Sequence, residues 1–192
     1  MQRNVVFLPL IILLCHVQTA RSDFYPPTAA QRAMSPDGNL LVRITAPVTS
    51  RKFDVAYYVF DAASDSYVRR SSFQMTGGPG EMMYVSNAGD LVLISLSEKD
   101  AIRLVSPSDG LVRSWDLSRF LSRREIKACA RTGSTLQWLE EGAFSNDTFR
   151  FRGPSTVIRA LGGTSYTVMS GAKPSVSFSG SLDAATGELI RQ

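Results

Sequence analysis

Two kinds of turn alternate along the chain, and this alternation constrains the fold more than any other feature of the sequence. The first kind opens a strand-like segment, and it occurs in SPDGNLLVRI at Ser35, SNAGDLVLIS at Ser86 and SNDTFRFRG at Ser145. The second kind joins two such segments, in VFDAASDSYVRR at Asp61, LVSPSDGLVRSW at Ser106 and SLDAATGELIRQ at Asp183. Asp, Asn and Ser side chains hydrogen-bond to their own backbone in tight turns, and glycine accepts positive φ. The order therefore predicts three imperfect repeats of one strand-pair unit.

The segments between these turns read as short β-strands. In FDVAYYVF, apolar Phe53, Val55, Tyr57 and Val59 alternate with residues of the opposite face. Other short segments are rich in β-branched or aromatic residues and are bounded by Gly, Pro, Ser, Asn or Asp: NLLVRITA, DLVLISL, AIRLV, LVRSW, TFRFRG, TVIRA and YTVMS. This pattern predicts an all-β fold, either a sandwich, a barrel or a propeller-like array.

One segment has a helical pattern instead. DLSRFLSRREIKACA places four apolar residues, Leu117, Phe120, Leu121 and Ile126, at helical spacing. We expect one amphipathic helix over 118–128, with Asp116 as its N-cap. Its basic residues, Arg119, Arg123, Arg124 and Lys127, are then expected on the solvated face.

The turns resemble those of β-propeller blades of the TolB-like and quinoprotein-like kind. In those blades S-x-D-G leads into one strand and D-x-x-T-G links the last strands, and the similarity covers most of 35–192. The elements DGLVRSWDL, LQW and TGEL also resemble a set of exported bacterial proteins to which no function is assigned. The resemblance implies an antiparallel β-fold and an exported protein, and it implies no activity.

Three units are too few to close a ring, because closed propellers need four or more blades. The alternatives are an open propeller-like arc, a twisted sandwich, or closure by pairing of the two chain ends. We expect a compact antiparallel domain over 35–192, sandwich-like or a partial propeller, in which the hairpin at Asp183 is the final unit. Residues 23–34, which include the loop-like stretch from Pro26, are expected to form a lead-in.

The N-terminal segment has the pattern of a secretory signal peptide. A positive start is followed by the apolar run Val5–Leu14, which is too short to span a bilayer, and then by small residues. We expect cleavage after Ser22, or alternatively after Ala20, and a periplasmic or secreted protein. A lipoprotein with lipidated Cys15 is disfavoured, because leucines precede the cysteine.

Removal of residues 1–22 narrows the possible chemistry. The sole histidine, His16, leaves with that segment, so that no Ser-His or Cys-His pair and no imidazole metal ligand would remain. Cys129 is left without a partner for an intramolecular disulfide, and its apolar surroundings predict a buried thiol. Arg3 and Arg21 also leave, and the remaining 19 basic and 17 acidic side chains give no case for nucleic-acid binding. No cofactor or metal site is predicted.

Carboxylates could still form an acid–base pair, and the candidates are Asp37, Asp61, Asp65, Asp116, Glu140 and Glu141. Turn or cap roles account better for the aspartates, and no calcium-loop pattern is present. Asn146 begins a glycosylation sequon, which reads as a turn in a bacterial protein.

Aromatic residues are the remaining lead to function. The possible contacts for a ligand or partner are Trp115, Trp138, Tyr57, Tyr58 and Tyr84, although large aromatics more often fill the core. The leading hypothesis is a non-catalytic exported domain that binds a protein or an envelope polymer. The alternative is a carbohydrate or small-ligand module that uses exposed aromatics, and a carboxylate-based hydrolase comes third.

Overall fold

The computed structural model describes residues 30–45, 52–76, 80, 82–108, 110, 112–132, 135–153, 157–160, 166–169 and 178–192. The expected signal segment, its cleavage sites and the alternative lipidation site at Cys15 lie outside the described residues. Within the described part of the chain, strands dominate, and helix is confined to two short segments. The expected all-β, antiparallel fold is therefore confirmed.

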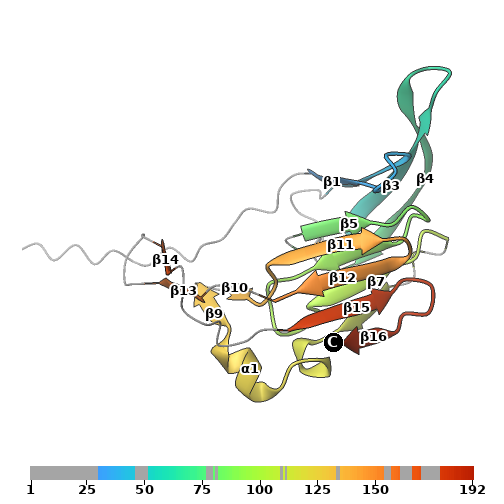
Figure 1. The fold of residues 1–192 in the computed structure, drawn as a ribbon. Coiled ribbons are helices and arrows are strands. Elements are labelled where there is room, and N and C mark those ends of the chain that lie inside the picture. Colours follow the sequence, from blue (N-terminus) through green and yellow to red (C-terminus); the bar gives the residue numbers. More distant parts are fainter. Residues whose placement is uncertain are drawn as a thin grey trace, which may run out of the picture.

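Twelve strands form three four-stranded antiparallel sheets, in each of which the strands follow one another in chain order (Figure 1). Sheet 1 contains β1 (Ala30–Met34), β2 (Leu40–Thr45), β3 (Lys52–Asp61) and β4 (Ser66–Thr76). Sheet 2 contains β5 (Met82–Val85), β6 (Leu91–Ile94), β7 (Ile102–Val105) and β8 (Val112–Trp115). Sheet 3 contains β11 (Glu141–Ser145), β12 (Thr148–Arg152), β15 (Ser179–Asp183) and β16 (Leu189–Arg191).

The predicted turns take equivalent places in the three sheets. Each turn of the first kind joins the first two strands of its sheet, and each turn of the second kind joins the last two. In the second kind, the residue four positions after the opening Asp or Ser has positive φ in all three copies: 48° at Asp65, 67° at Gly110 and 72° at Gly187. Three repeats are thus present, as the turn pattern predicts, but each unit has four strands rather than the expected strand pair.

The first kind of turn is held by a buried serine. The Oγ atom of Ser35 accepts a hydrogen bond from the Leu40 N–H at 2.9 Å, and Ser86 Oγ accepts one from the Asp90 N–H at the same distance. Both serines are almost inaccessible to solvent, because the strands of their hairpins close around them. The Ser145 copy is instead a two-residue turn, in which Asn146 has φ of 54°.

Sheet 2 lies between the other two sheets, and both faces of its central strands β6 and β7 are buried. Leu91 and Leu93 of β6 face sheet 1 and join the cluster that includes Val42, Val55 and Tyr57. The alternate β6 residues face sheet 3 and pack with Phe149, Phe151 and Leu182 of that sheet, among others. Because neither face of β6 meets water, its sequence LVLI is continuously apolar rather than alternating.

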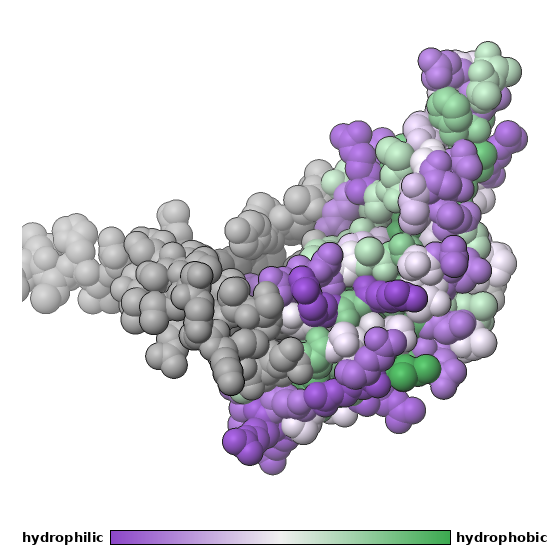
Figure 2. Space-filling view, in the orientation of Figure 1, coloured by the Kyte–Doolittle hydropathy of each residue, from purple (hydrophilic) through white to green (hydrophobic). Residues whose placement is uncertain are grey.

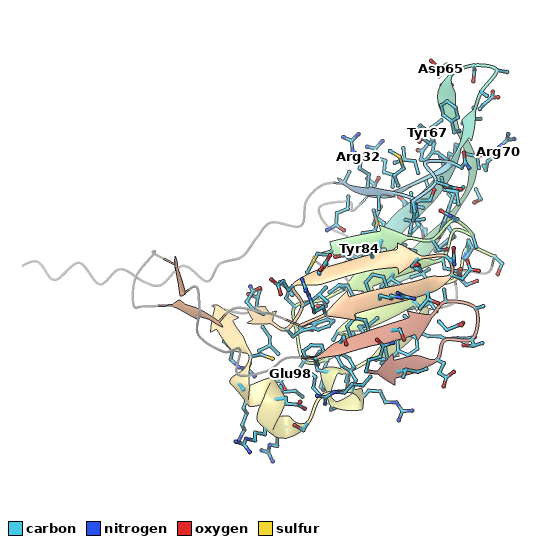
Figure 3. The ribbon with its side chains drawn as sticks, in the orientation of Figure 1. Arg32, Asp65, Tyr67, Arg70, Tyr84 and Glu98 are labelled. Atoms are coloured by element: carbon cyan, nitrogen blue, oxygen red, sulfur yellow. The ribbon has the colours of Figure 1, made fainter. Side chains whose placement is uncertain are left out.

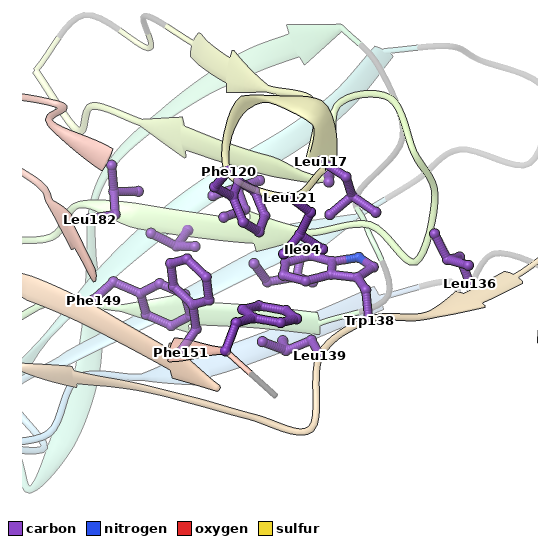
Figure 4. Packing of buried hydrophobic residues seen from close by; sticks show 14 of the residues in the cluster. Ile94, Leu117, Phe120, Leu121, Leu136, Trp138, Leu139, Phe149, Phe151 and Leu182 are labelled. Atoms are coloured by element: carbon purple, nitrogen blue, oxygen red, sulfur yellow. The ribbon is translucent and has the colours of Figure 1, made fainter. Parts of the chain in front are cut away.

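The cluster between sheets 2 and 3 centres on Trp138, which has no solvent-exposed surface (Figure 4). Its indole N–H donates to the Ser95 carbonyl at 2.8 Å, which satisfies the polar atom of a buried ring. Phe120 and Phe151 pack against it with centroid distances of 5.7 and 6.2 Å. These aromatic contacts fix the helical segment on the core.

The helical segment is divided where one helix was expected. A 3-10 turn, η1 (Leu117–Arg119), is followed by the short helix α1 (Arg123–Ala128). The Ser122 side chain accepts from the Glu125 N–H, and the Glu125 carboxylate accepts from the Ser122 N–H, which forms a capping box that starts α1. Asp116 stands at the N-cap position of η1, as expected, but its side chain makes no cap bond there, and the N-cap of α1 is Ser122.

The expected lead-in is wrong for its last residues. Ala30–Met34 form β1, which pairs along its whole length with β2.

Two small hairpins complete the described strands. They are β9 (Ala130–Thr132) with β10 (Thr135–Gln137), and β13 (Val157–Ala160) with β14 (Tyr166–Met169).

Candidate functional site

The outer faces of sheets 1 and 3 differ in character. Residues on these faces belong to neither buried cluster. The outer face of sheet 3 is mostly polar and consists of Glu141, Ala143, Ser145, Thr148, Arg150, Arg152, Ser179, Ser181, Asp183 and Ile190. The outer face of sheet 1 has more large apolar and aromatic side chains, and it includes Arg32, Met34, Leu41, Arg43, Asp54, Ala56, Tyr58, Phe60, Tyr67 and Arg69. Terminal units of stacked repeats need a polar outer face, and sheet 3 meets that need better than sheet 1.

A groove of about 350 Å³ opens on this outer face of sheet 1. It is lined by Ala30, Gln31, Arg32, Leu41, Arg43, Tyr58 and Tyr67, from all four strands of the sheet. Its volume is at the lower end of the range of small-ligand pockets, which run from about 300 to 1,000 Å³. It can therefore hold one or two side chains of a partner, or one small ligand.

Two arginines lie directly opposite each other in this groove. Arg32 of β1 and Arg43 of β2 are register partners, so their side chains leave the same face of the sheet. Both are exposed, and neither forms an ion pair with another described residue. Like charges directly opposite each other destabilise a strand pair. A bound anion would remove this repulsion between the two arginines.

Aromatic side chains form the other end of the groove. Tyr58 of β3 is the register partner of Leu41 of β2. Leu41 lies two residues before Arg43 on the same strand, so this pair is next to the arginine pair on the same face. The Tyr67 hydroxyl donates to the Gly38 carbonyl at 2.6 Å, which fixes the phenol on the groove wall. The ring of Tyr67 also packs edge-on against Phe60, with a centroid distance of 5.4 Å. The groove thus combines two cations with rigid apolar walls.

The β3–β4 hairpin extends past the rest of the molecule, and Tyr67 lies on it (Figures 1 and 3). Apolar and polar residues are mixed along its surface (Figure 2). Its base contains a β-bulge: the register shifts between Tyr57 and Tyr58, and Arg70 is the extra residue on β4. Bulges and charges on an edge strand disfavour pairing with another strand, so the face of this sheet is a better contact surface than its edge.

The structure distributes the predicted aromatic residues over different places. Trp138 and Tyr57 are buried in the two separate clusters, so neither is an exposed stacking surface. Trp115 and Tyr84 are half-buried and pack against the Trp138 cluster. Of the five residues, Tyr58 alone lines the groove.

The carboxylate candidates are held in local structure. The Asp37 carboxylate accepts from Ser35 Oγ at 2.6 Å, and this hydrogen bond is the main cause of its lowered pKa. Asp61 is held in the same way by Ser64 Oγ at 2.8 Å, and its pKa is also lowered. Asp116 accepts from the Asp100 N–H at 2.9 Å. The bonds of Asp37 and Asp61 are those of turns, as the sequence pattern favours, whereas Asp116 binds the loop that precedes β7.

The last two candidates share one arginine. Arg152 binds Glu141 at 2.8 Å and lies 4.0 Å from Glu140, where β11 begins and β12 ends.

Burial of Cys129 raises the pKa of its thiol, in agreement with the predicted buried side chain. Among the described residues, no group of three or more His, Cys, Asp or Glu side chains is placed to hold a metal ion. No helix in the described ranges combines the length and apolar character needed to cross a membrane.

No protein-family model and no curated protein sequence matches this chain. Among solved structures, the crystal structure of puromycin hydrolase is similar over 84% of this chain and 21% of that chain, with 15% sequence identity and a TM-score of 0.39. The present chain thus spans about a fifth of the length of that protein. A similarity of this size supports no assignment of activity.

Proposed function

We propose that this chain is a non-catalytic binding domain whose outer sheet-1 face contacts a partner protein. The observation that carries the proposal is the contrast between the two outer faces. Met34, Leu41, Tyr58 and Tyr67 lie together on sheet 1, whereas sheet 3 presents mainly hydroxyl and charged groups. Tyrosine, methionine and arginine are the residues that protein interfaces enrich, which favours a protein over an envelope polymer.

Met34 and Ile190 offer a matched test of this surface. Both are exposed large apolar residues, 55% and 47% accessible, and they lie on the outer faces of sheets 1 and 3, respectively. A photo-crosslinking amino acid at each position would be compared in the native cell fraction, with crosslinked proteins identified by mass spectrometry. We expect one defined protein to crosslink from position 34 and none from position 190.

The crosslinked protein would then be purified and its affinity measured for Met34→Asp and Ile190→Asp. A charge at Met34 should weaken binding by about tenfold or more, because an interface core excludes unpaired charge. Ile190→Asp should leave the affinity unchanged. Equal affinity of both variants, or crosslinking from position 190 alone, would move the contact surface away from sheet 1.

A further inference from the structure

We propose that the segment of the partner that enters the groove is acidic, and that one of its carboxylates binds between Arg32 and Arg43. This inference rests on the proposed function, because it names the chemistry of the partner at that same face. The two guanidinium groups stand on register partners of neighbouring strands. Cβ atoms of such partners are about 5 Å apart, so both side chains can reach one carboxylate.

The charge on the outer face of sheet 1 is uneven. Arg69 of β4 is a third arginine on this face, opposite Tyr58, and it donates to Ser72 Oγ at 2.6 Å. The one carboxylate among the outer-face residues of sheet 1 is Asp54, which already accepts a hydrogen bond from Gln74 Nε2 at 3.0 Å. Three arginines and Lys52, which lies on the same face two residues before Asp54, outnumber this one carboxylate. The face therefore has a positive potential that attracts an anionic partner.

The type of anion follows from the donors. A guanidinium presents its N–H groups in a planar fork that matches the two oxygens of a carboxylate. The row that contains Leu41 and Tyr58 lies two residues along the strands from the Arg32–Arg43 row, a distance of about 6.6 Å. In an extended peptide that runs along the strands, side chains two residues apart lie on one face at this same spacing. When an acidic residue lies over the arginines, an apolar residue two positions away therefore lies over Leu41 and Tyr58.

An acidic protein segment is favoured over an acidic polysaccharide. The second contact row contains Met34, Leu41, Tyr58 and Arg69, and neither of its two apolar side chains has a ring on which a sugar could stack. The apolar side chains of an extended peptide fit such a surface without a ring-to-ring contact. Beyond Arg69, whose guanidinium already donates to Ser72 Oγ, the same row offers a chain of phosphates only the phenol of Tyr58 as a hydrogen-bond donor.

The test uses the full folded domain and two labelled peptides. In the first peptide glutamate and leucine stand two residues apart, separated by serines (Glu-Ser-Leu-Ser repeated), so that both lie on one face of the extended chain. In the second peptide glutamine replaces each glutamate. Fluorescence anisotropy should show binding of the glutamate peptide at least about tenfold tighter than binding of the glutamine peptide. The difference should shrink as salt is raised from about 0.05 to 0.5 M, because exposed charges are screened. Equal affinity for the two peptides would overturn the proposal.

Arg43→Gln and Arg150→Gln form a matched pair of variants. Arg150 lies on the outer face of sheet 3, so its replacement should not alter peptide affinity. Arg43→Gln should remove most of the preference for glutamate, and its melting temperature should stay equal to or exceed that of the wild type, since a like-charge pair is relieved. An unchanged preference in Arg43→Gln would overturn the assignment.

Two further results separate the possible failures. Binding of oligogalacturonate without binding of the glutamate peptide would overturn the assignment to a protein segment. If the wild-type domain shows no preference for the glutamate peptide but still crosslinks from position 34, the proposed function stands and only the carboxylate contact is removed. Absence of any partner at position 34 would remove the proposed function, and with it this inference.

Discussion

Arg191 binds the Glu125 carboxylate with both arms of its guanidinium group, Nη1 to Oε2 at 3.0 Å and Nη2 to Oε1 at 2.5 Å. The same guanidinium donates to the Phe120 carbonyl at 3.2 Å. Glu125 also completes the capping box with Ser122. One carboxylate therefore connects the start of α1 to β16, two elements that are far apart in the sequence.

The Glu125 pair should make the domain sensitive to acid. Arg191, followed by Ser122, lowers the pKa of Glu125 from its ordinary 4.5 to about 2. The stabilisation is therefore complete above pH 4.5 and is lost as the pH falls toward 2. Glu125→Gln should reduce stability at pH 7 by about 1 kcal/mol through loss of the cap and the ion pair.

Urea unfolding of wild type and Glu125→Gln at several pH values would check this expectation. The two stabilities should converge as the pH is lowered through the window from 4.5 to about 2. Glu188→Gln serves as a control, because Glu188 is an exposed residue of the turn before β16. A constant difference between wild type and Glu125→Gln from pH 7 to pH 2 would contradict the assignment.

Gly187→Val should destabilise the domain by more than about 1 kcal/mol, because Gly187 has φ of 72°, where a β-branched residue is strained. A Cβ atom at this position would clash with Nη1 of Arg113, which donates to the Thr186 carbonyl. The substitution would be repeated in an Arg113→Ala background, where strain remains and the clash is gone. Calorimetry should then show a smaller but clear loss, and an unchanged melting temperature in both backgrounds would disprove the strain.

Asp90→Asn should stabilise the domain at neutral pH. Asp90 is half-buried, and burial, with a smaller effect from Asp147, raises its pKa above 3.8. Because the pKa of this carboxyl group is raised in the folded state, the domain loses stability as the pH rises through the interval from 3.8 to that raised value. The neutral amide avoids this loss, so the melting temperature at pH 7 should rise by about 1–3 °C. The gain should vanish near pH 3, and a gain that persists there would have another cause.

Trp138→Phe should cost about 1–3 kcal/mol, since it leaves a cavity and removes the donor to the Ser95 carbonyl. Trp115→Phe is the matched control, because Trp115 is half-buried at the margin of the same cluster. Its replacement should cost less than about 1 kcal/mol. Circular dichroism during urea unfolding would compare the two variants, and an equal cost would indicate that Trp138 is not central to the core.

Turn chemistry is local, and for that reason the repeats could be recognised in the sequence. The side chain that holds each turn is only a few residues from the backbone group it binds, as at Ser35 and Ser86. The helical spacing correctly indicated that Leu117, Phe120 and Leu121 face the core. The division of the helix also had a local signal, the S-x-x-E pattern from Ser122 to Glu125, which the sequence interpretation did not use.

The groove could not be predicted, because it depends on register between strands. Arg32 and Arg43 are eleven residues apart in the sequence and become neighbours only through the pairing of β1 with β2. The prolines before Ala30 gave that region a loop-like composition, which concealed β1. Tyr57 and Tyr58 are adjacent in sequence, yet one is buried against sheet 2 and the other lines the groove. Residue type alone does not separate such a pair.

The position of sheet 2 limits how the chain could be shortened. A fragment that lacks residues 30–76 would keep sheets 2 and 3, but Leu91, Leu93 and Val105 would then face water. Such a fragment would expose a flat apolar surface to solvent and would be expected to aggregate. Polar replacements at these leucines and this valine would therefore have to accompany any truncated version intended for laboratory use.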